Sequence, residues 1–333
     1  MAFKYCALIL FLILRFAAGE VVTQKPAWNY DPTGEQGPSE WHRGDKDCGG
    51  HYQSPIAFWQ EDVVVDNDLP AFDLIGYEKD LQGLQLENNG HTVKIEINST
   101  YHGLKIQGGG LEKDTYYRLA QFHFHWGADD TVGSEHMLGN HYYPFEMHLV
   151  HIKGSLPLAE ALKQPQGLAV LGVFFEHSDV DNNTALMPLI EVMHQVIDKG
   201  GKARLRRPIK ARDLLPLDVS NFFRYQGSLT TPPCSEVVTW TMFVDAHPIT
   251  TLQIAKFRSI SKKDKIDEAA DADEPDLEGR LLFNHRPVQP LYERKVSVRK
   301  ALKCALPSKS SANTVVPFSS VISFLSVLVS LSV

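Results

Sequence analysis

Short runs of mostly apolar residues recur between residues 90 and 245, bounded by Gly, Pro or Asn. Such runs, rich in Val, Ile, Phe and Tyr, are typical of β-strands. They predict strands at residues 92–98, 116–126, 145–152, 168–175 and 237–244. Apolar residues at near-helical spacing predict one helix at 186–199, which Gly200 and Gly201 would end. Many strands with few helices indicate an α+β fold with a single core.

Two of the predicted strands carry histidines on one face. Side chains of successive strand residues point to opposite faces, so His123 and His125 share a face. On the second strand, His148 shares a face with Glu146 and Val150. If the strands pair, the three imidazoles can bind one Zn²⁺ and leave its fourth position to water, as in catalytic zinc sites. Taken alone, a His-x-His pair is more simply explained as two polar residues on a solvent-exposed strand face.

The residues around these histidines strengthen the zinc interpretation. Glu146 and Gln121 are placed to orient ligand imidazoles, as the partners of metal-binding histidines commonly do. His151 falls on the opposite face of its strand and is predicted to be a structural histidine.

Composition narrows the class of protein. The chain has 333 residues, of which 43% are hydrophobic and 22% charged, and this is a globular composition. A formal net charge of -7, without a basic patch interleaved with aromatic residues, gives no support to nucleic-acid binding. With 4 Cys, the chain is not a disulfide-dense scaffold.

Both ends of the chain resemble processing signals. Residues 1–19 combine a basic residue, an apolar run and small residues, which predicts a secretory signal peptide. Residues 301–310 are predicted to be a short stalk, and the uncharged segment 311–333 a GPI-attachment signal with Ser310 as the attachment residue. A retained membrane-spanning helix is the alternative for this tail.

If the chain is secreted, its cysteines can form disulfides and its Asn-x-Ser/Thr sequons can be glycosylated. An oxidising compartment favours a Cys48–Cys234 disulfide, although spacing alone allows any pairing with Cys304. Two sequons predict glycosylation at Asn98 and Asn182.

Several longer motifs occur in one order along the chain. They are QFHFHW at 121–126, GSEH at 133–136, EMHLVH at 146–151 and GSLTTPP at 227–233, with shorter segments at 53–55, 88–91 and 284–291. Together, across residues 28–295, they resemble the alpha-class carbonic anhydrases, and the two ends with Cys48 and Cys234 resemble the GPI-anchored branch. The resemblance implies one catalytic domain, residues 20–300, on a large, mostly antiparallel, twisted ten-stranded β-sheet with a few short surface helices. It places zinc at the base of a cone-shaped cleft.

The resemblance also assigns roles to individual residues. Thr230 would accept a hydrogen bond from the activated water and donate one to Glu135, and Thr231 would lie beside bicarbonate. His91 would be the proton shuttle. The implied carbon dioxide wall comprises Val150, Val170, Leu229, Val238 and Trp240, and the implied supporting residues are Gln121, Glu146, Asn284, Tyr30 and Asn89.

The implied activity is reversible hydration of carbon dioxide to bicarbonate and a proton at the outer face of the plasma membrane. The expected partners are carbon dioxide and bicarbonate, the membrane through a lipid anchor, and a bicarbonate transporter. The chain is expected to be a monomer that does not bind nucleic acid. A binding module without activity is the main alternative, but such modules typically lack a zinc histidine. Another zinc hydrolase is a second alternative, although the helical His-Glu-x-x-His motif is absent.

Overall fold

A computed structural model describes residues 27–97, 103–180, 182–264, 279–300, 302 and 305–311. Its centre is one sheet of 13 strands, to which two small two-stranded sheets, β1–β9 and β4–β13, are added. The strands are β1 (Ala57–Phe58), β2 (Val63–Val65), β3 (Phe72–Ile75), β4 (Asp80–Leu81), β5 (Gln85–Asn88), β6 (Val93–Glu96), β7 (Lys105–Gly108), β8 (Tyr117–Trp126), β9 (Met137–Leu138), β10 (Phe145–Lys153), β11 (Leu168–His177), β12 (Lys202–Arg204), β13 (Ile209–Lys210), β14 (Phe222–Gly227), β15 (Val238–Phe243), β16 (His247–Ile249) and β17 (Val296–Val298).

The order across the main sheet is β12-β5-β6-β8-β10-β11-β15-β14-β17-β2, with β3, β7 and β16 attached beside this path. Most neighbouring pairs are antiparallel, while β11 runs parallel to β15 and β16, and β17 runs parallel to β2. The fold class and the five predicted strands are confirmed. The continuous path across the sheet has the ten strands that the resemblance implied, and β3, β7 and β16, attached beside this path, bring the sheet to 13 strands.

The sheet separates two apolar cores. Phe122, Phe124 and Trp126 on β8 are fully buried in the larger core on one face. The smaller core, on the other face, includes Val150, Val170 and Trp240 from the three central strands β10, β11 and β15. The aromatic side of β8 is therefore anchored in protein, as its alternation predicted, and the histidine side faces the smaller core.

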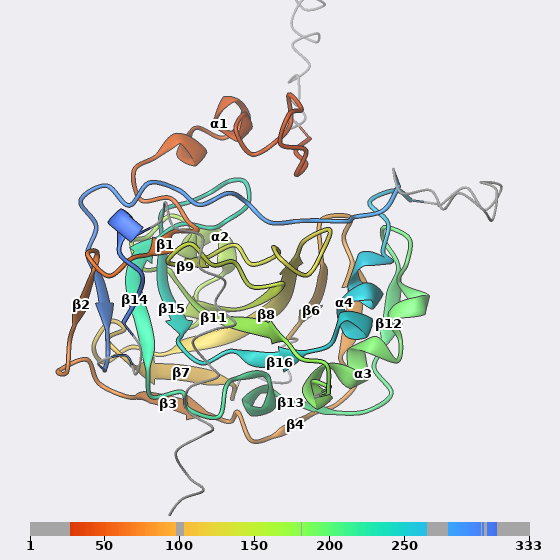
Figure 1. The fold of residues 1–333 in the computed structure, drawn as a ribbon. Helices are drawn as coiled ribbons and strands as arrows, with labels where there is room; N and C mark the ends of the chain where they lie inside the picture. Colours follow the sequence, from red (N-terminus) through yellow and green to blue (C-terminus); the bar gives the residue numbers. More distant parts are fainter. Residues whose placement is uncertain are drawn as a thin grey trace, which may run out of the picture.

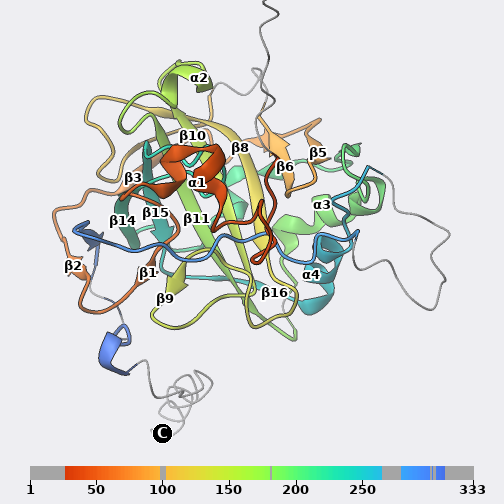
Figure 2. The same cartoon turned by 90° about the horizontal axis from the view of Figure 1, so that it is seen from above.

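Helices are short and lie at the margins of the sheet. They are α1 (Trp41–Gly44), α2 (Leu158–Ala161), α3 (Met187–Ile190) and α4 (Thr251–Arg258), with 3-10 turns η1 (Lys46–Gly49), η3 (Thr184–Leu186), η4 (Met193–Gln195), η5 (Ala211–Leu214) and η6 (Lys309–Ser311). Figure 1 and Figure 2 show α3 and α4 together at one side of the molecule and β2 and β14 at the other.

The prediction of one continuous helix at 186–199 is wrong. The segment forms one α-helical turn and two 3-10 turns, because the backbone leaves the helical region at Val192, where φ is -110° and ψ is 0°. Leu189, Val192 and Val196 are nevertheless fully buried. Packing of these side chains against the core overrides the local helical preference.

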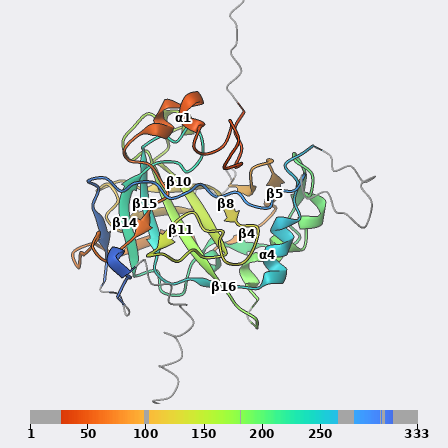
Figure 3. The same cartoon turned by 45° about the horizontal axis from the view of Figure 1, so that its top comes forward.

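The N-terminal segment, which carries α1, stands over the strands (Figure 3). A disulfide joins Cys48 in this segment to Cys234, which confirms the predicted pair. Both cysteines are buried in a small cluster with Tyr30 and Trp41. The bridge therefore fixes the N-terminal segment to the loop that follows Thr230.

The C-terminal residues that the structure describes lie against the domain. Leu306 is buried, the backbone N–H of Gln60 donates to the carbonyl of Pro307, and Lys309 forms an ion pair with Asp62. No helix in the described part of the chain is long and apolar enough to cross a membrane. The predicted signal peptide, Asn98, Cys304 and the tail beyond Ser311 lie outside the described residues.

Candidate metal centre

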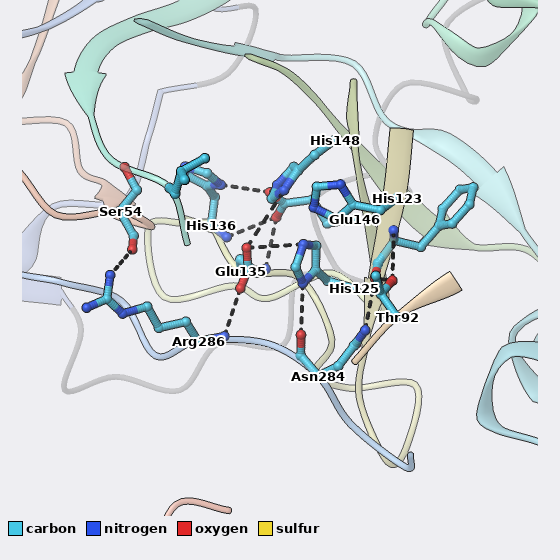
Figure 4. A network of polar contacts seen from close by, with 12 residues as sticks. Ser54, Thr92, His123, His125, Glu135, His136, Glu146, His148, Asn284 and Arg286 are labelled. Carbon is cyan, nitrogen blue, oxygen red and sulfur yellow. Dashed lines mark hydrogen bonds and ion pairs between the residues drawn. The ribbon is translucent and has the colours of Figure 1, made fainter. Parts of the chain in front are cut away.

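The pairing of β8 with β10 brings the three histidines together. His148 lies directly opposite His123 in the antiparallel register, and Glu146 lies opposite His125. All three rings point toward one another in Figure 4. Their ligand nitrogens lie within 4.8 Å of one another, so the three residues could hold one metal ion. The strand pairing predicted from the sequence therefore produces the predicted cluster.

Each ring is oriented by a hydrogen-bond acceptor on its outer nitrogen. Nδ1 of His123 lies 2.9 Å from Oε1 of Gln121, and Nδ1 of His125 lies 2.8 Å from the carbonyl oxygen of Asn284. Nε2 of His148 donates to Oε1 of Glu146 at 2.6 Å. Because these partners are acceptors, the outer nitrogens carry the protons and the inner nitrogens present lone pairs.

The inner nitrogens fit a transition-metal ion such as Zn²⁺. Nε2 of His125 is buried and has no hydrogen-bond partner among the described residues, which is costly unless a ligand satisfies it. Burial lowers the pKa of His123, His125 and His148, and this keeps the imidazoles neutral. Neutral imidazoles suit zinc, and three of them leave a fourth position open.

The buried carboxylate of Glu146 accepts four hydrogen bonds from the residues of the centre. Its Oε1 accepts from His148 and from Nδ1 of His136, and its Oε2 accepts from the backbone N–H groups of Glu135 and His136, each at 2.9 Å. Burial alone would raise the pKa of this carboxyl, but the charge and hydrogen bonds of His136 and His148 lower it. The side chain is therefore a carboxylate that fixes the tautomer of His148.

Glu135 is a second buried carboxyl beside the cluster. Its Oε2 lies 3.4 Å from Nε2 of His125, and its Oε1 accepts from the backbone N–H of Arg286 at 2.9 Å. Burial raises the pKa of Glu135, and the negative charge of Glu146 raises it further. Hydrogen bonding by Thr230 lowers this pKa, so Thr230 lies close to Glu135.

An apolar pocket of about 270 Å³ opens beside the cluster. His123 and His148 form its metal-side edge, and Thr230 and Thr231 lie along it. Of the predicted wall residues, Val150, Val170, Leu229 and Trp240 line the pocket, together with the unpredicted Leu158, Leu162 and Leu168. Val238 is buried in the same core but is not among the lining residues.

The residues predicted to transfer protons lie toward the N-terminal segment. The ring of His91 stacks on Trp28 at 3.9 Å, and both line a second hollow that also contains Tyr30. Oδ1 of Asn89 accepts from the backbone N–H groups of His91 and Thr92, so this side chain shapes the turn. Burial, followed by the charge of Lys199, lowers the pKa of His91 to about 4.

Sequence reasoning missed two residues of this network. The buried guanidinium of Arg286 donates to Oε1 of Gln53 and to the carbonyls of Ser54 and Cys48. His136 also contacts the Tyr225 hydroxyl, at 2.6 Å. His136 lies in the GSEH motif, but nothing in the local pattern shows that its ring turns inward.

The structure describes two of the three predicted modification residues. Asn182 is exposed, and its Oδ1 accepts from the Thr250 hydroxyl. Ser310 lies in η6, and its hydroxyl is 2.8 Å from that of Ser308. Asn98 falls outside the described residues.

Comparison with known proteins agrees with this geometry. The sequence model of the eukaryotic-type carbonic anhydrase family matches residues 36–300. Carbonic anhydrase 7 of Homo sapiens is 36% identical over 277 residues, which cover 83% of this chain and 98% of that protein. Carbonic anhydrase 15 of Mus musculus is 35% identical over 297 residues, 87% of this chain and 88% of that protein. A Caenorhabditis elegans protein whose name marks it as a candidate carbonic anhydrase is 38% identical over 291 residues, 86% of each chain. The chain therefore belongs to the alpha-class, eukaryotic-type carbonic anhydrases.

Proposed function

We propose that this enzyme uses Zn²⁺ to hydrate carbon dioxide reversibly to bicarbonate and a proton at the outer cell surface. The observation that supports it best is the convergence of three imidazole nitrogens beside an apolar pocket of about 270 Å³. Carbon dioxide is apolar, so the pocket suits the substrate, and the nitrogens suit the metal. Family membership supplies the reaction.

His123, His125 and His148 would hold the zinc. When bound, the metal supplies a water molecule whose pKa is lowered to about 7, and this produces a nucleophile at neutral pH. Glu146 keeps His148 in the tautomer that can bind, while Gln121 and the Asn284 carbonyl do the same for His123 and His125.

Thr230 and Glu135 would orient the nucleophile. The backbone N–H of Arg286 holds the carboxyl of Glu135 in place. This carboxyl would accept a hydrogen bond from the Thr230 hydroxyl. The Thr230 oxygen is then left to accept a hydrogen bond from the attacking water, which turns a lone pair toward carbon dioxide. Thr231, at the pocket edge, would contact the bicarbonate product.

His91 would carry the released proton away from the site. An imidazole is suited to this transfer, because its ordinary pKa is close to neutrality. Tyr30 lines the same hollow as His91, and Tyr30 with Gln121 and Asn89 would order the water chain between the metal centre and the shuttle.

The proposed location rests on the sequence of the two ends. A signal peptide at 1–19 would direct secretion, and a lipid anchor at Ser310 would hold a monomeric domain on the membrane beside a bicarbonate transporter. The Cys48–Cys234 disulfide supports an oxidising compartment. Glycans at Asn98 and Asn182 would be compatible with it. Release from cells by phosphatidylinositol-specific phospholipase tests the anchor, and retention after treatment indicates a spanning helix.

The enzymatic proposal is tested by stopped-flow carbon dioxide hydration with zinc content measured on the same sample. We expect one zinc per chain and rapid hydration, both lost in His123→Ala. His194→Ala, at an exposed histidine outside the site, is the matched control and should keep both. Bound zinc without hydration would contradict the proposal and favour a binding module.

A further inference from the structure

Exposed apolar side chains gather around one of the two predicted glycosylation residues, Asn182. Among the large apolar residues that the structure describes, the three most exposed are Leu217, Val180 and Leu252, whose exposed fractions are 95%, 82% and 80%. Val180 lies two positions before Asn182, and Leu217 lines the same hollow as Asn182. Leu252 lies two positions after Thr250, whose hydroxyl donates to Oδ1 of Asn182 at 3.3 Å. A single exposed apolar residue needs no explanation, but a group of them marks a surface that another group covers.

The hollow beside Asn182 has a volume of about 510 Å³, which is within the range of pockets that hold small molecules. Its lining comes from residues 182–185, from the segment 212–217 and from β16. Figure 1 shows β13 and β16, which adjoin these segments, at the end of the molecule away from α1. The hollow shares no lining residue with the metal pocket, so a group bound here leaves the metal pocket open.

The backbone that carries Leu217 is fixed by hydrogen bonds. The guanidinium of Arg212 donates to the carbonyls of Leu215, Pro216 and Leu217 at 3.2, 2.9 and 2.8 Å. Leu215 is itself buried in the larger core. The exposure of the Leu217 side chain is therefore a feature of the fold, and covering this side chain would be favourable.

The side chain of Asn182 is oriented as well. Its hydrogen bond from Thr250 uses the amide oxygen, whereas an N-linked sugar is attached to the amide nitrogen. The next residue, Asn183, is buried, and its side chain donates to the carbonyl of Pro248 and accepts from the backbone N–H of Leu186, both at 3.2 Å. A sugar on Asn182 would therefore begin from a fixed position at the hollow, which reduces the entropic cost of holding the sugar there.

The lining of the hollow suits a sugar. A pyranose ring has faces made of C–H groups and an edge of hydroxyl groups. Leu217 and Pro248 offer apolar surface to such a face. Thr184, Arg212 and Asp213 also line the hollow, and they offer donors and acceptors to hydroxyl and acetamido groups.

We propose that an N-linked glycan on Asn182 folds back onto the protein, with its first N-acetylglucosamine in this hollow and over Leu217. This role rests on the glycosylation that we propose for the secreted chain. In the attachment, a bond forms between Nδ2 of Asn182 and C1 of the sugar, and Nδ2 loses one proton. The bond from C1 to the lipid diphosphate that carried the oligosaccharide breaks, and the lipid diphosphate leaves with the electron pair.

Hydroxyl-radical footprinting of the full secreted chain tests this role, because oxidation of a side chain follows its exposure to solvent. With the glycan present, Leu217 should be oxidised at least about threefold more slowly than in Asn182→Gln, as expected if its exposed fraction falls from 95% to roughly a third. Trimming a high-mannose glycan to its first sugar with endoglycosidase H should keep this protection. Leu158, at the metal pocket, is the internal reference and should not change. Thr184→Ser retains the sequon and should retain both the glycan and the protection.

Mass spectrometry of the same samples separates the outcomes. A glycan on Asn182 with Leu217 oxidised as fast as in Asn182→Gln overturns the inference and leaves the glycosylation intact. An unmodified Asn182 overturns both. Protection of Leu217 that appears only at high protein concentration assigns the surface to a second copy of the chain and also overturns the inference.

Two further measurements connect this surface to the rest of the protein. In sedimentation velocity, Asn182→Gln should self-associate more than the glycosylated parent, and Leu217→Ser/Leu252→Ser added to it should reverse the effect; equal association of all three proteins contradicts a covering role. Carbon dioxide hydration should be the same in Asn182→Gln as in the parent. Absence of hydration in both proteins overturns the proposed activity, while protection of Leu217 by the glycan would still support this inference.

Discussion

Replacing Glu146 by Gln removes one negative charge and keeps the shape of the side chain. The substitution therefore tests how the carboxylate, as distinct from its shape, contributes to zinc binding and stability. The carboxylate accepts four hydrogen bonds, two from backbone N–H groups and two from the imidazoles of His136 and His148. An amide has one oxygen to accept hydrogen bonds and one NH₂ that can only donate. Gln at this position must therefore leave one pair of donors without an acceptor.

Both orientations of the amide disturb the site. If NH₂ faces the two backbone N–H groups, these buried donors lose their acceptor, at about 1–3 kcal/mol each. If NH₂ faces the imidazoles, Nε2 of His148 must become an acceptor. Its proton then moves to Nδ1, the nitrogen that faces the cluster, and His148 can no longer donate a lone pair to a metal.

We therefore expect Glu146→Gln to weaken zinc binding about 10- to 100-fold, the usual loss for a partner of a ligand histidine. This corresponds to about 1.4–2.7 kcal/mol. Equilibrium competition with a chromogenic chelator measures the affinity, and denaturant unfolding in EDTA measures the stability of the metal-free protein. Glu96→Gln, at an exposed carboxylate, is the matched control. Zinc affinity within twofold of the parent, with an unchanged unfolding midpoint, would refute the reasoning.

The disulfide closes a separation of 186 residues, so Cys48→Ser/Cys234→Ser should lower the free energy of unfolding by about 5 kcal/mol; an unchanged urea midpoint contradicts this. Arg286→Met leaves three buried acceptors without a donor and should cost about 3–5 kcal/mol in the same assay, whereas a loss below about 1 kcal/mol contradicts it. Burial lowers the pKa of His151 to about 3, below the unfolded value of about 6.5, so only the unfolded chain binds this proton between those values. Between about pH 3 and 6.5, protonation of His151 in the unfolded chain should lower the free energy of unfolding by about 1.4 kcal/mol for each unit by which the pH falls. The pH dependence should be less steep in His151→Gln, and parallel profiles for both proteins in urea unfolding contradict the assignment.

The metal site could be predicted from the sequence because its geometry is local. Alternation along a strand places His123 with His125 and His148 with Glu146, and pairing of two strands completes the cluster. His151, predicted to be structural, bonds to Tyr77 and to the carbonyl of Ala169 on the other face.

Contacts between distant segments could not be predicted in this way. Arg286 reaches Gln53 across 233 positions, and no spacing rule connects them. A local signal was overlooked for α4, where Thr250 and Gln253 form a capping box, a known start signal for helices. The helix predicted at 186–199 shows the reverse error, because core packing interrupts a locally plausible helix.

The Cys48–Cys234 bridge has a consequence for biosynthesis. At about 5–20 residues per second, the 186 positions between the two cysteines take roughly 10–40 s to synthesise. During that interval, Cys48 cannot form the native disulfide, because Cys234 has not yet been synthesised. Cys6 lies in the predicted signal peptide, and Cys234 emerges 70 positions before Cys304 (304 minus 234), so the native partner is available to Cys48 before the thiol of Cys304 exists. The order of translation therefore favours the correct bridge.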